Sequence, residues 1–264
     1  MTLVWRPGNN AITDPDALIY IDKIEKVDGQ NLEYDVAKAI NDFVVGCKTD
    51  GIWDAIKACC ILAGARTTNG ALVPLVGAAP DPYNFDLVDD TDYDRKTGLQ
   101  GNGSTKYLDS NRLASAQPQN SVHIAVYGAT IQTNTTNMLI GALSNDAAQR
   151  ATLFPASATQ LYCQLHFGGN YAATHTSLAS GFIGGNRSNS TEITTRAAGT
   201  SITGNATSTP PPAVDYFIFA RNFNGPSQYS TSRLAFYSIG EALDLAALDT
   251  RVSTLITAIG AAIP

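Results

Sequence analysis

The stretch RLAFYSIGEALDLAALDTRVSTLITAI, Arg233–Ile259, changes its apolar period halfway along. Residues Leu234–Ile239 form a short apolar and aromatic run closed by Gly240, which is typical of a buried β-strand. From Glu241 onward, apolar residues recur at steps of three and four, which places them on one stripe of a helix. The stripe consists of Leu245, Leu248, Val252, Leu255 and Ile259. We therefore predict that a β-sheet body ends here and that a terminal helix occupies residues 241–264.

The sheet body should begin near residue 67. Between 67 and 240, short β-prone runs alternate with clusters of Gly, Asn, Asp and Pro at regular intervals, which predicts an antiparallel β-sandwich. The run Val122–Tyr127 shows the clearest strand pattern. Strands are expected at 72–76, 106–108, 122–127, 137–141, 161–167, 181–183, 192–196, 216–220 and 234–239. The Gly/Thr/Ser/Pro-rich segment 198–212 predicts a loop or a protruding hairpin.

Residues 13–66 predict a helical segment. Asp14 followed by Pro15 is typical of a helix cap with proline at the first helical position. A second helix is expected at 31–45, and a third at 49–62. Such short helices must share a core with each other or dock on a larger body.

The composition limits the classes of function. Charged residues make up 15% of the 264 positions, well below the roughly 25% of ordinary globular proteins. The net charge of -6 argues against nucleic-acid binding through phosphate contacts. No apolar run reaches the roughly 18 residues of a membrane span, and the first residues lack the pattern of a signal peptide. We therefore expect assembly in a cytoplasm, without a membrane span.

The reactive residue types do not form a recognisable catalytic pattern. His123 and His166 lie in predicted strands, and His175 lies in a Thr/Ser-rich turn where we expect it to be exposed. No GxSxG or HExxH motif accompanies them, and the E-x-D-x-E pattern of glycan-cleaving sandwiches is absent. The cysteines lack zinc spacing and are expected to be buried thiols. These are Cys47, Cys59, Cys60 and Cys163. We expect no catalytic residue and no bound cofactor.

Two groups of residues could bind a ligand. The densest acidic patch could hold calcium, which takes six to eight oxygen ligands, although its spacing does not match an EF-hand and a solvated loop is the favoured alternative. Its members are Asp86, Asp89, Asp90, Asp92 and Asp94. Aromatic residues in or near Gly/Asn-rich loops could form a sugar-binding platform, with packing at the sandwich rim as the favoured alternative. They are Tyr171, Phe182, Phe223 and Tyr229.

Several segments resemble a family of virion structural proteins of tailed phages, including cyanophages. The segments are AINDFVVGCKTDGIWDAIKACCILAGART (39–67), ALVPLVG (71–77), YDRKTGLQGNGSTKYLDSNR (93–112), FIFARNFNG (217–225) and SRLAFYSIGEALDLAALDTRVSTLI (232–256). The resemblance covers roughly residues 30 to 264. It implies a concanavalin A-like, or laminin G-like, jelly-roll β-sandwich with N-terminal helices and a C-terminal helix.

The resemblance also implies a non-enzymatic role in a virion. The first hypothesis is a tail or head fibre, or a tail-associated protein, that contacts a host surface glycan. The alternatives are a capsid decoration (cement) protein and a carbohydrate-binding module outside any virus. The partners would be other virion proteins and copies of the chain itself, most often arranged as a trimer.

Two segments bear on assembly. Residues 1–12, interrupted by Pro7, Gly8, Asn9 and Asn10, predict an extended arm that a neighbouring chain would hold. The apolar stripe of the terminal helix could form a parallel coiled coil. Two heptads are short for a free coil, so packing within the chain is the favoured alternative.

Overall fold

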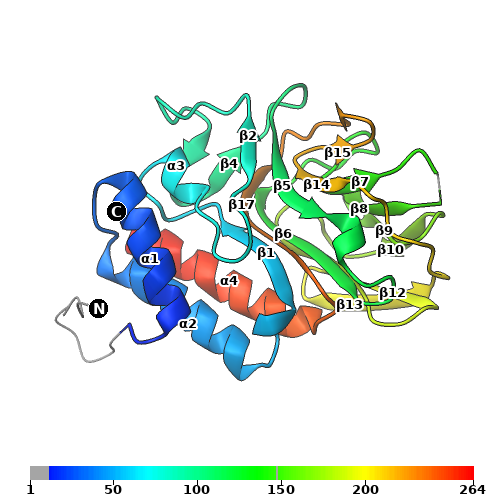
Figure 1. The fold of residues 1–264 in the computed structure, drawn as a ribbon, viewed down its shortest axis with the longest axis horizontal. Coiled ribbons are helices and arrows are strands. Elements are labelled where there is room, and N and C mark those ends of the chain that lie inside the picture. The colour runs from blue at the N-terminus through cyan, green and yellow to red at the C-terminus, as the bar shows by residue number, and fades with distance from the viewer. Residues whose placement is uncertain (1–11, 147) are drawn as a thin grey trace.

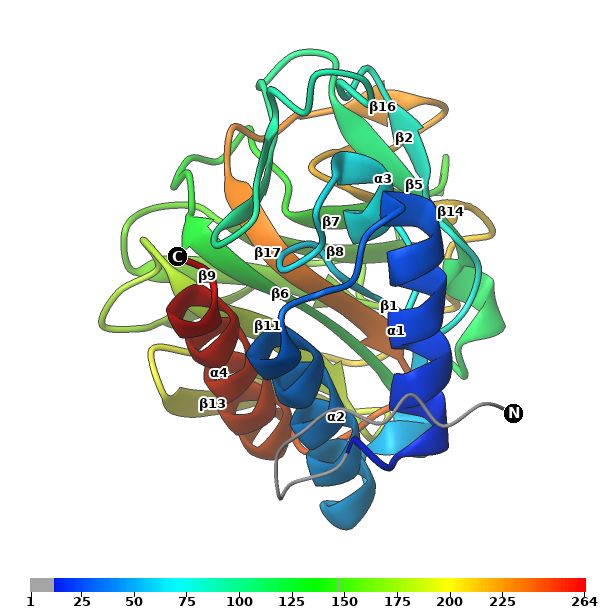
Figure 2. The same ribbon diagram turned by 90° about the vertical axis from the view of Figure 1, so that its left-hand side faces the viewer.

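The computed structural model describes residues 12–146 and 148–264, so most of the predicted arm lies outside the described residues. The chain forms three layers: helices cover one face of an eight-stranded sheet, and a nine-stranded sheet covers the other face (Figures 1 and 2). The predicted antiparallel β-sandwich with N-terminal helices and a C-terminal helix is confirmed.

The helices and the strands have the following bounds. The helices are α1 (Pro15–Asp28), α2 (Tyr34–Thr49), α3 (Thr68–Ala71) and α4 (Leu245–Ala262), with short 3₁₀ turns η1 (Trp53–Ala55) and η2 (Ala114–Ala116). The first sheet has the order β13 (Thr200–Asn205), β12 (Glu192–Ala197), β11 (Gly181–Arg187), β6 (Val122–Thr130), β17 (Arg233–Gly240), β4 (Gly98–Gln100) and β3 (Tyr93–Asp94), and β1 (Ile56–Ile61) also pairs with β17.

The second sheet has the order β10 (Tyr171–Thr174), β9 (Gln160–Leu165), β8 (Arg150–Pro155), β7 (Ile140–Leu143), β14 (Asp215–Ile218), β5 (Tyr107–Leu113) and β2 (Asp81–Tyr83). Two short strands extend it, β15 (Arg221–Asn222) beside β7 and β16 (Pro226–Ser227) beside β15. The described pairings are antiparallel except that of β15 with β7. Among residues 12–146 and 148–264, no α-helix covers the outer face of this sheet.

Strand β17 contributes to two hydrophobic cores at once. Phe236 points to the helices and meets Phe43 of α2 edge to face, with ring centroids 5.7 Å apart. Tyr237 and Ile239 belong to the core between the two sheets. Because both faces of the first sheet are covered, a strand at its centre must be apolar on both sides, which explains the continuous run Leu234–Ile239.

Helix α4 packs on α2 through the predicted stripe. All five stripe residues are buried within the chain, so the stripe is not available for a free coiled coil. Gly46 lets the Arg251 side chain cross α2, and the guanidinium donates to both carboxylate oxygens of Asp50 at 2.7 and 2.8 Å. Arg196 of β12 donates to Asp249 at 2.8 Å and ties α4 to the first sheet.

By length and composition alone, α4 is the one helix in the described part of the chain that could cross a membrane. Its apolar positions are the ones that pack against the rest of the chain, as in the core helix of a globular protein.

The predicted third helix at 49–62 is wrong, because Ile56–Ile61 is strand β1. Its residues alternate between the two cores: Cys59 and Ile61 face the helices, whereas Ala58 and Cys60 face the second sheet. A short run that is apolar on both sides reads equally well as a helix or as a strand.

Other differences from the predicted strands are smaller. Segment 72–76 forms no strand ladder: it pairs with β1 at the isolated Cys59–Val76 bridge, and Pro74 has no N–H to donate. The segment 198–212 contains β13, which forms a hairpin with β12. The sequence analysis also missed seven strands, namely β2, β3, β4, β8, β10, β15 and β16.

We predict that Leu248→Ala lowers the free energy of unfolding by about 2–5 kcal/mol, because it leaves a cavity between α4 and α2. Chemical denaturation monitored by circular dichroism measures this loss. Thr257→Ala, at an exposed position of the same helix, should change stability by less than about 0.5 kcal/mol. An unchanged free energy for Leu248→Ala, combined with the loss of an oligomer, would place the stripe in a coiled coil instead.

Candidate functional site

Aromatic side chains stand in a row on the outer face of the second sheet. The rings of Tyr83 and Tyr107 stack in parallel with centroids 4.4 Å apart, and Phe217 follows Tyr107 at 4.6 Å. Tyr229 meets Tyr107 edge to face at 6.2 Å. Tyr83 lies directly opposite Tyr107 in the β2–β5 register, so the sheet itself aligns the first pair. We call these four residues the aromatic row.

The row ends in an accessible ring. Tyr107 and Phe217 are buried and Tyr229 is half-buried, whereas Tyr83 is 42% exposed. Strand β2 is the last strand of the sheet on this side, and Tyr107 covers only one face of the Tyr83 ring. In the described part of the chain, no aromatic ring covers its other face. Tyr83 therefore offers a flat apolar surface to a ligand.

Three carboxylates lie beside the aromatic row. Asp81 is directly opposite Asp109, Asp109 is opposite Phe217, and Asp215 is two residues before Phe217 on β14. Residues opposite each other, or two apart on a strand, point to the same face of a sheet. The three aspartates therefore share the outer face with the rings. We call the aromatic row and these carboxylates together the aromatic–carboxylate face.

The negative charge of these carboxylates is not balanced by a basic side chain in the described part of the chain. No Lys or Arg in the described residues forms an ion pair with Asp81, Asp109 or Asp215. Burial raises the pKa of Asp109, and the charges of Asp215 and Asp81 raise it further, although the backbone N–H of Asn111 donates to it at 3.0 Å. Burial also raises the pKa of Asp215. Their grouping costs stability, which is a common property of ligand-binding sites.

The aromatic–carboxylate face has the chemistry of a sugar site. An exposed ring face can stack on the C–H groups of a sugar, and ionised carboxylates accept hydrogen bonds from hydroxyl groups. Residues two apart on a strand are separated by roughly 6.5–7 Å. A single sugar ring can therefore contact Tyr83 and Asp81 together.

Only one of the four aromatic residues predicted for this role lies in the row, namely Tyr229. Phe223 is 40% exposed and lies 5.4 Å from the Arg221 guanidinium, apart from the row. Phe182 is buried in the core beneath the helices, because β11 is an interior strand of the first sheet. Tyr171 is half-buried and donates its hydroxyl to the Ile202 carbonyl at 3.2 Å.

Sequence reasoning missed Tyr83, Tyr107 and Phe217. A signal was present, because an aspartate and an aromatic residue stand two apart in three separate segments. The segments are DPY at 81–83, YLD at 107–109 and DYF at 215–217. Each places an acid and a ring on the same face of a strand.

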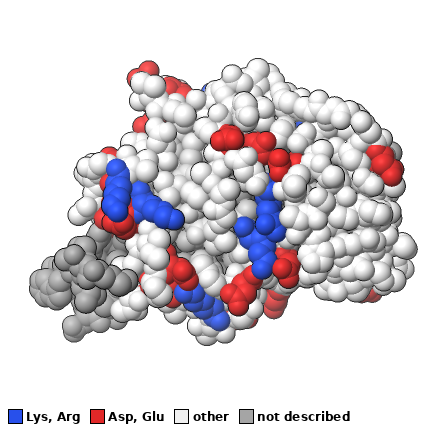
Figure 3. Space-filling view, viewed as in Figure 1, with Lys and Arg blue, Asp and Glu red and all other residues white. Residues whose placement is uncertain are grey.

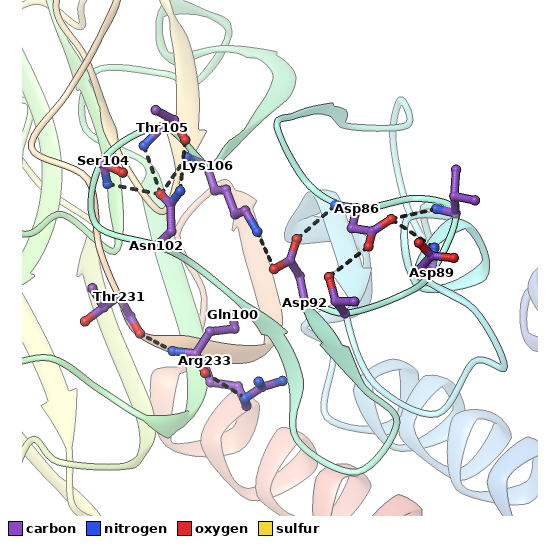
Figure 4. Close-up of polar contacts among 12 residues, drawn as sticks. Asp86, Asp89, Asp92, Gln100, Asn102, Ser104, Thr105, Lys106, Thr231 and Arg233 are labelled. Atoms are coloured by element: carbon purple, nitrogen blue, oxygen red, sulfur yellow. Dashed lines mark hydrogen bonds and ion pairs between the residues drawn. The ribbon is translucent and has the colours of Figure 1, made fainter.

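The acidic patch of residues 86–94 shapes a loop (Figure 4). Asp86 accepts hydrogen bonds from the backbone N–H groups of Val88 and Asp89 at 3.0 and 2.9 Å, which hold its pKa at about 2. Asp92 accepts from the N–H of Asp86 at 2.9 Å and forms an ion pair with Lys106. These contacts fix the loop in place.

The other acids of the patch also bind backbone groups. Asp90 accepts from the N–H of Thr68 at 2.7 Å, and Asp94 accepts from the N–H groups of Lys96 and Thr97 at 2.9 and 2.8 Å. Asp89 is exposed. Among the described residues, no three acidic, histidine or cysteine side chains are grouped as a metal site would require. The five carboxylates thus do not converge on a calcium ion.

The loop of residues 86–94 is linked to the turn before β5, and through it to the aromatic row. Asn102 accepts from the N–H groups of Ser104, Thr105 and Lys106 at 3.0, 2.9 and 3.0 Å, which closes the turn before β5 (Figure 4). Lys106 then reaches back to Asp92, and the next residue is Tyr107. The loop acids therefore hold the start of the strand that carries Tyr107.

The three histidines are buried in the interior of the protein. His123 Nε2 lies 2.7 Å from Ser238 Oγ, a nucleophile–base spacing, but both residues are fully buried and a substrate cannot reach them. Burial lowers the pKa of His123 and of His166 to about 4, so both are neutral at pH 7. The prediction that His175 is exposed is wrong: it is 4% exposed and contacts Thr195 Oγ1 at 3.1 Å.

Of the comparisons with known proteins, only the one with solved structures finds similar chains. No family model matches the chain, and no curated protein is similar to it. A Trypanosoma rangeli sialidase mutant displaying trans-sialidase activity matches at a TM-score of 0.48 and 11% identity over 85% of this chain and 40% of that one. The botulinum neurotoxin serotype D binding domain matches at 0.48 and 11% over 76% and 51%.

Domains LG4-5 of the mouse laminin alpha1 chain match at a TM-score of 0.40 and 12% identity over 66% of this chain and 47% of that chain. The chain spans 27% of the length of the NanB sialidase of Streptococcus pneumoniae, to which it is also similar. Likeness at this level gives no information about ligand or activity.

We predict that Asp109→Asn raises the melting temperature at pH 7. The pKa of Asp109 is higher in the folded state than in the unfolded state. Its carboxyl therefore contributes stability to the folded state below the unfolded pKa, and this contribution is lost as the pH rises through the folded pKa. Removing the charge removes this cost at neutral pH. Differential scanning calorimetry should show the gain shrinking as the pH falls through the raised pKa of the folded state and vanishing below about 4, where the carboxyl is protonated in both states.

Asp89→Asn, in the exposed loop, is the matched control and should leave the melting temperature unchanged across this range. A loss of stability for Asp109→Asn at pH 7 would contradict the raised pKa.

Proposed function

We propose that this chain is a non-catalytic binding module that holds a glycan on the aromatic–carboxylate face. One observation carries the proposal: a free ring face of Tyr83 lies beside carboxylates that lack a cation among the described residues. A sugar would supply C–H groups to the ring and hydroxyl hydrogens to the oxygens.

The charge of the face selects the class of sugar. Asp81, Asp109 and Asp215 repel a ligand that carries its own carboxylate or sulfate. A neutral hexose donates hydroxyl hydrogens, and an amino sugar adds an ammonium group that pairs with the carboxylates. We therefore assign neutral or amino-sugar glycans as ligands, rather than acidic ones.

The face is suited to binding rather than to cleavage. Glycoside hydrolysis needs two carboxylates on opposite sides of the scissile bond. Asp81 and Asp109 instead stand side by side on neighbouring strands of one sheet face. A glycan lying on this face would be held by one side only.

We further propose that the module belongs to a bacteriophage particle, as part of a tail or head fibre or a tail-associated protein that contacts host glycans. The resemblance of its sequence segments to tailed-phage virion proteins supports this placement. A fibre would carry the module in several copies, most often three, so that weak contacts to single sugars add up.

A capsid decoration protein is the second candidate. The low charge of the surface favours it, since closely packed subunits then bury few charged groups. Figure 3 shows one face of the molecule, in the view of Figure 1. On it the charged side chains lie mostly over the helices and their junction with the sandwich, whereas the far end of the sandwich carries few of them. Quantitative mass spectrometry of purified particles separates the two, because a fibre is present in a handful of copies and a decoration protein in hundreds.

We predict that Tyr83→Ala weakens glycan binding about 10-fold, the equivalent of about 1.4 kcal/mol, because the stacking surface is lost. The probes are neutral, amino and sialylated oligosaccharides on an array, followed by calorimetric titration of the strongest binder. Tyr83→Phe should bind as the unaltered chain does, because the ring remains.

Val88→Ala is the control, since Val88 is 86% exposed in the adjoining loop and lies outside the face. A chain that binds none of the three probe classes, or a Tyr83→Ala variant with full affinity, would contradict the proposed function. Preference for the sialylated probe would contradict the assigned sugar class.

A further inference from the structure

Three Asn-Gly pairs occur in the chain, and this dipeptide is the one most prone to spontaneous deamidation. They are Asn69–Gly70, Asn102–Gly103 and Asn224–Gly225. In this reaction, the backbone nitrogen of the glycine attacks the side-chain carbonyl carbon, Cγ, of the asparagine. Glycine has no side chain to hinder that approach. The surroundings of each pair therefore decide which asparagine reacts in the folded protein.

Two of the three pairs are held by hydrogen bonds. The Gly70 N–H donates to Thr67 Oγ1 at 3.1 Å, and the Gly103 N–H donates to the Ser230 carbonyl at 3.1 Å. Asn102 is held as well, because its Oδ1 accepts three backbone N–H groups at 3.0, 2.9 and 3.0 Å. Attack by either of these glycine nitrogens would first have to break such contacts.

The third pair lies in the turn between β15 and β16. Asn224 is exposed, and in the described part of the chain the Gly225 N–H donates to no acceptor. A Cβ built on Gly225 would meet no atom within 4 Å, so no neighbour restrains this glycine. The Asn224 amide donates to Asn145 Oδ1, an exposed contact that water can replace. Gly225 is thus free to reach the side chain of Asn224.

The surroundings of this turn favour a carboxylate. Arg221 lies three residues before Asn224 and is half-buried, with its guanidinium 5.4 Å from the Phe223 ring. Among the described residues, no carboxylate forms an ion pair with Arg221. Burial lowers the pKa of Arg221, and the charge of Arg150 lowers it further. A negative charge nearby would offset both effects.

We infer that Asn224 is a site of spontaneous deamidation, which adds a negative charge beside Arg221. The Gly225 nitrogen forms a bond to Asn224 Cγ and gives up its proton, and the side-chain amide takes up a proton and leaves as ammonia. Water then opens the resulting succinimide at one of its two carbonyl carbons, which yields aspartate or isoaspartate. One water is consumed and one ammonia is released, so the reaction needs no oxidant, enzyme or cofactor.

Peptide mapping of the incubated full chain tests the site. The folded protein is kept at mildly alkaline pH in water labelled with heavy oxygen, and mass spectrometry follows the label at each Asn-Gly pair. We expect Asn224 to react about 10-fold faster than Asn102, which corresponds to about 1.4 kcal/mol, within the range of a broken hydrogen bond.

The same chain in denaturant is the matched control. Unfolding removes the hydrogen bonds of Gly70 and Gly103, so the three pairs should then react at similar rates. Equal rates in the folded protein, or faster reaction at Asn69 or Asn102 than at Asn224, would overturn the inference.

The placement of the new charge has its own test. Asn224→Asp imitates the aspartate product, and its effect on the melting temperature is measured in the unaltered chain and in an Arg221→Gln background. We expect the change to be less favourable when Arg221 is absent, because the carboxylate then lacks its cation. The same effect in both backgrounds would show that the charge does not interact with Arg221.

Discussion

The structure depends on one strand that must be buried on both faces. Strand β17 pairs with β6 along one edge and with β1 and β4 along the other. Phe236 anchors the helical layer through Phe43, and Tyr237 and Ile239 anchor the second sheet. The helices therefore do not form a separate domain: they close a sheet face that would otherwise expose apolar side chains to water.

This arrangement explains which elements the sequence could predict. The period-two strand at Val122–Tyr127 and the period-3.6 stripe of α4 each have a clear repeat, and both were found. Strand β1 lies between the same two cores as β17 but lacks a closing turn pattern that would separate it from a helix. What decides its structure is its pairing with β17, nearly 180 residues away, and no local pattern encodes that contact.

The candidate site was less predictable than the fold for a related reason. The segments at 81–83, 107–109 and 215–217 each place an acid and a ring on one face, but their importance appears only when β2, β5 and β14 are neighbours. Loop composition pointed to Tyr171, Phe182, Phe223 and Tyr229 instead, and only Tyr229 belongs to the row. The acids at 86–94 were conspicuous by number, yet they hold backbone turns and so position Tyr107 indirectly.

The buried thiols have a consequence for where such a chain can work. Burial raises the pKa of Cys47, Cys60 and Cys163 to about 12 and that of Cys59 well above its usual value, so thiolate, the form that reacts with oxidants, is scarce at neutral pH. The same covalent structure should then persist in a reducing cell interior and in aerated water outside it. Such a chain can pass from a reducing to an oxidising environment without forming a disulfide bond among its four cysteines.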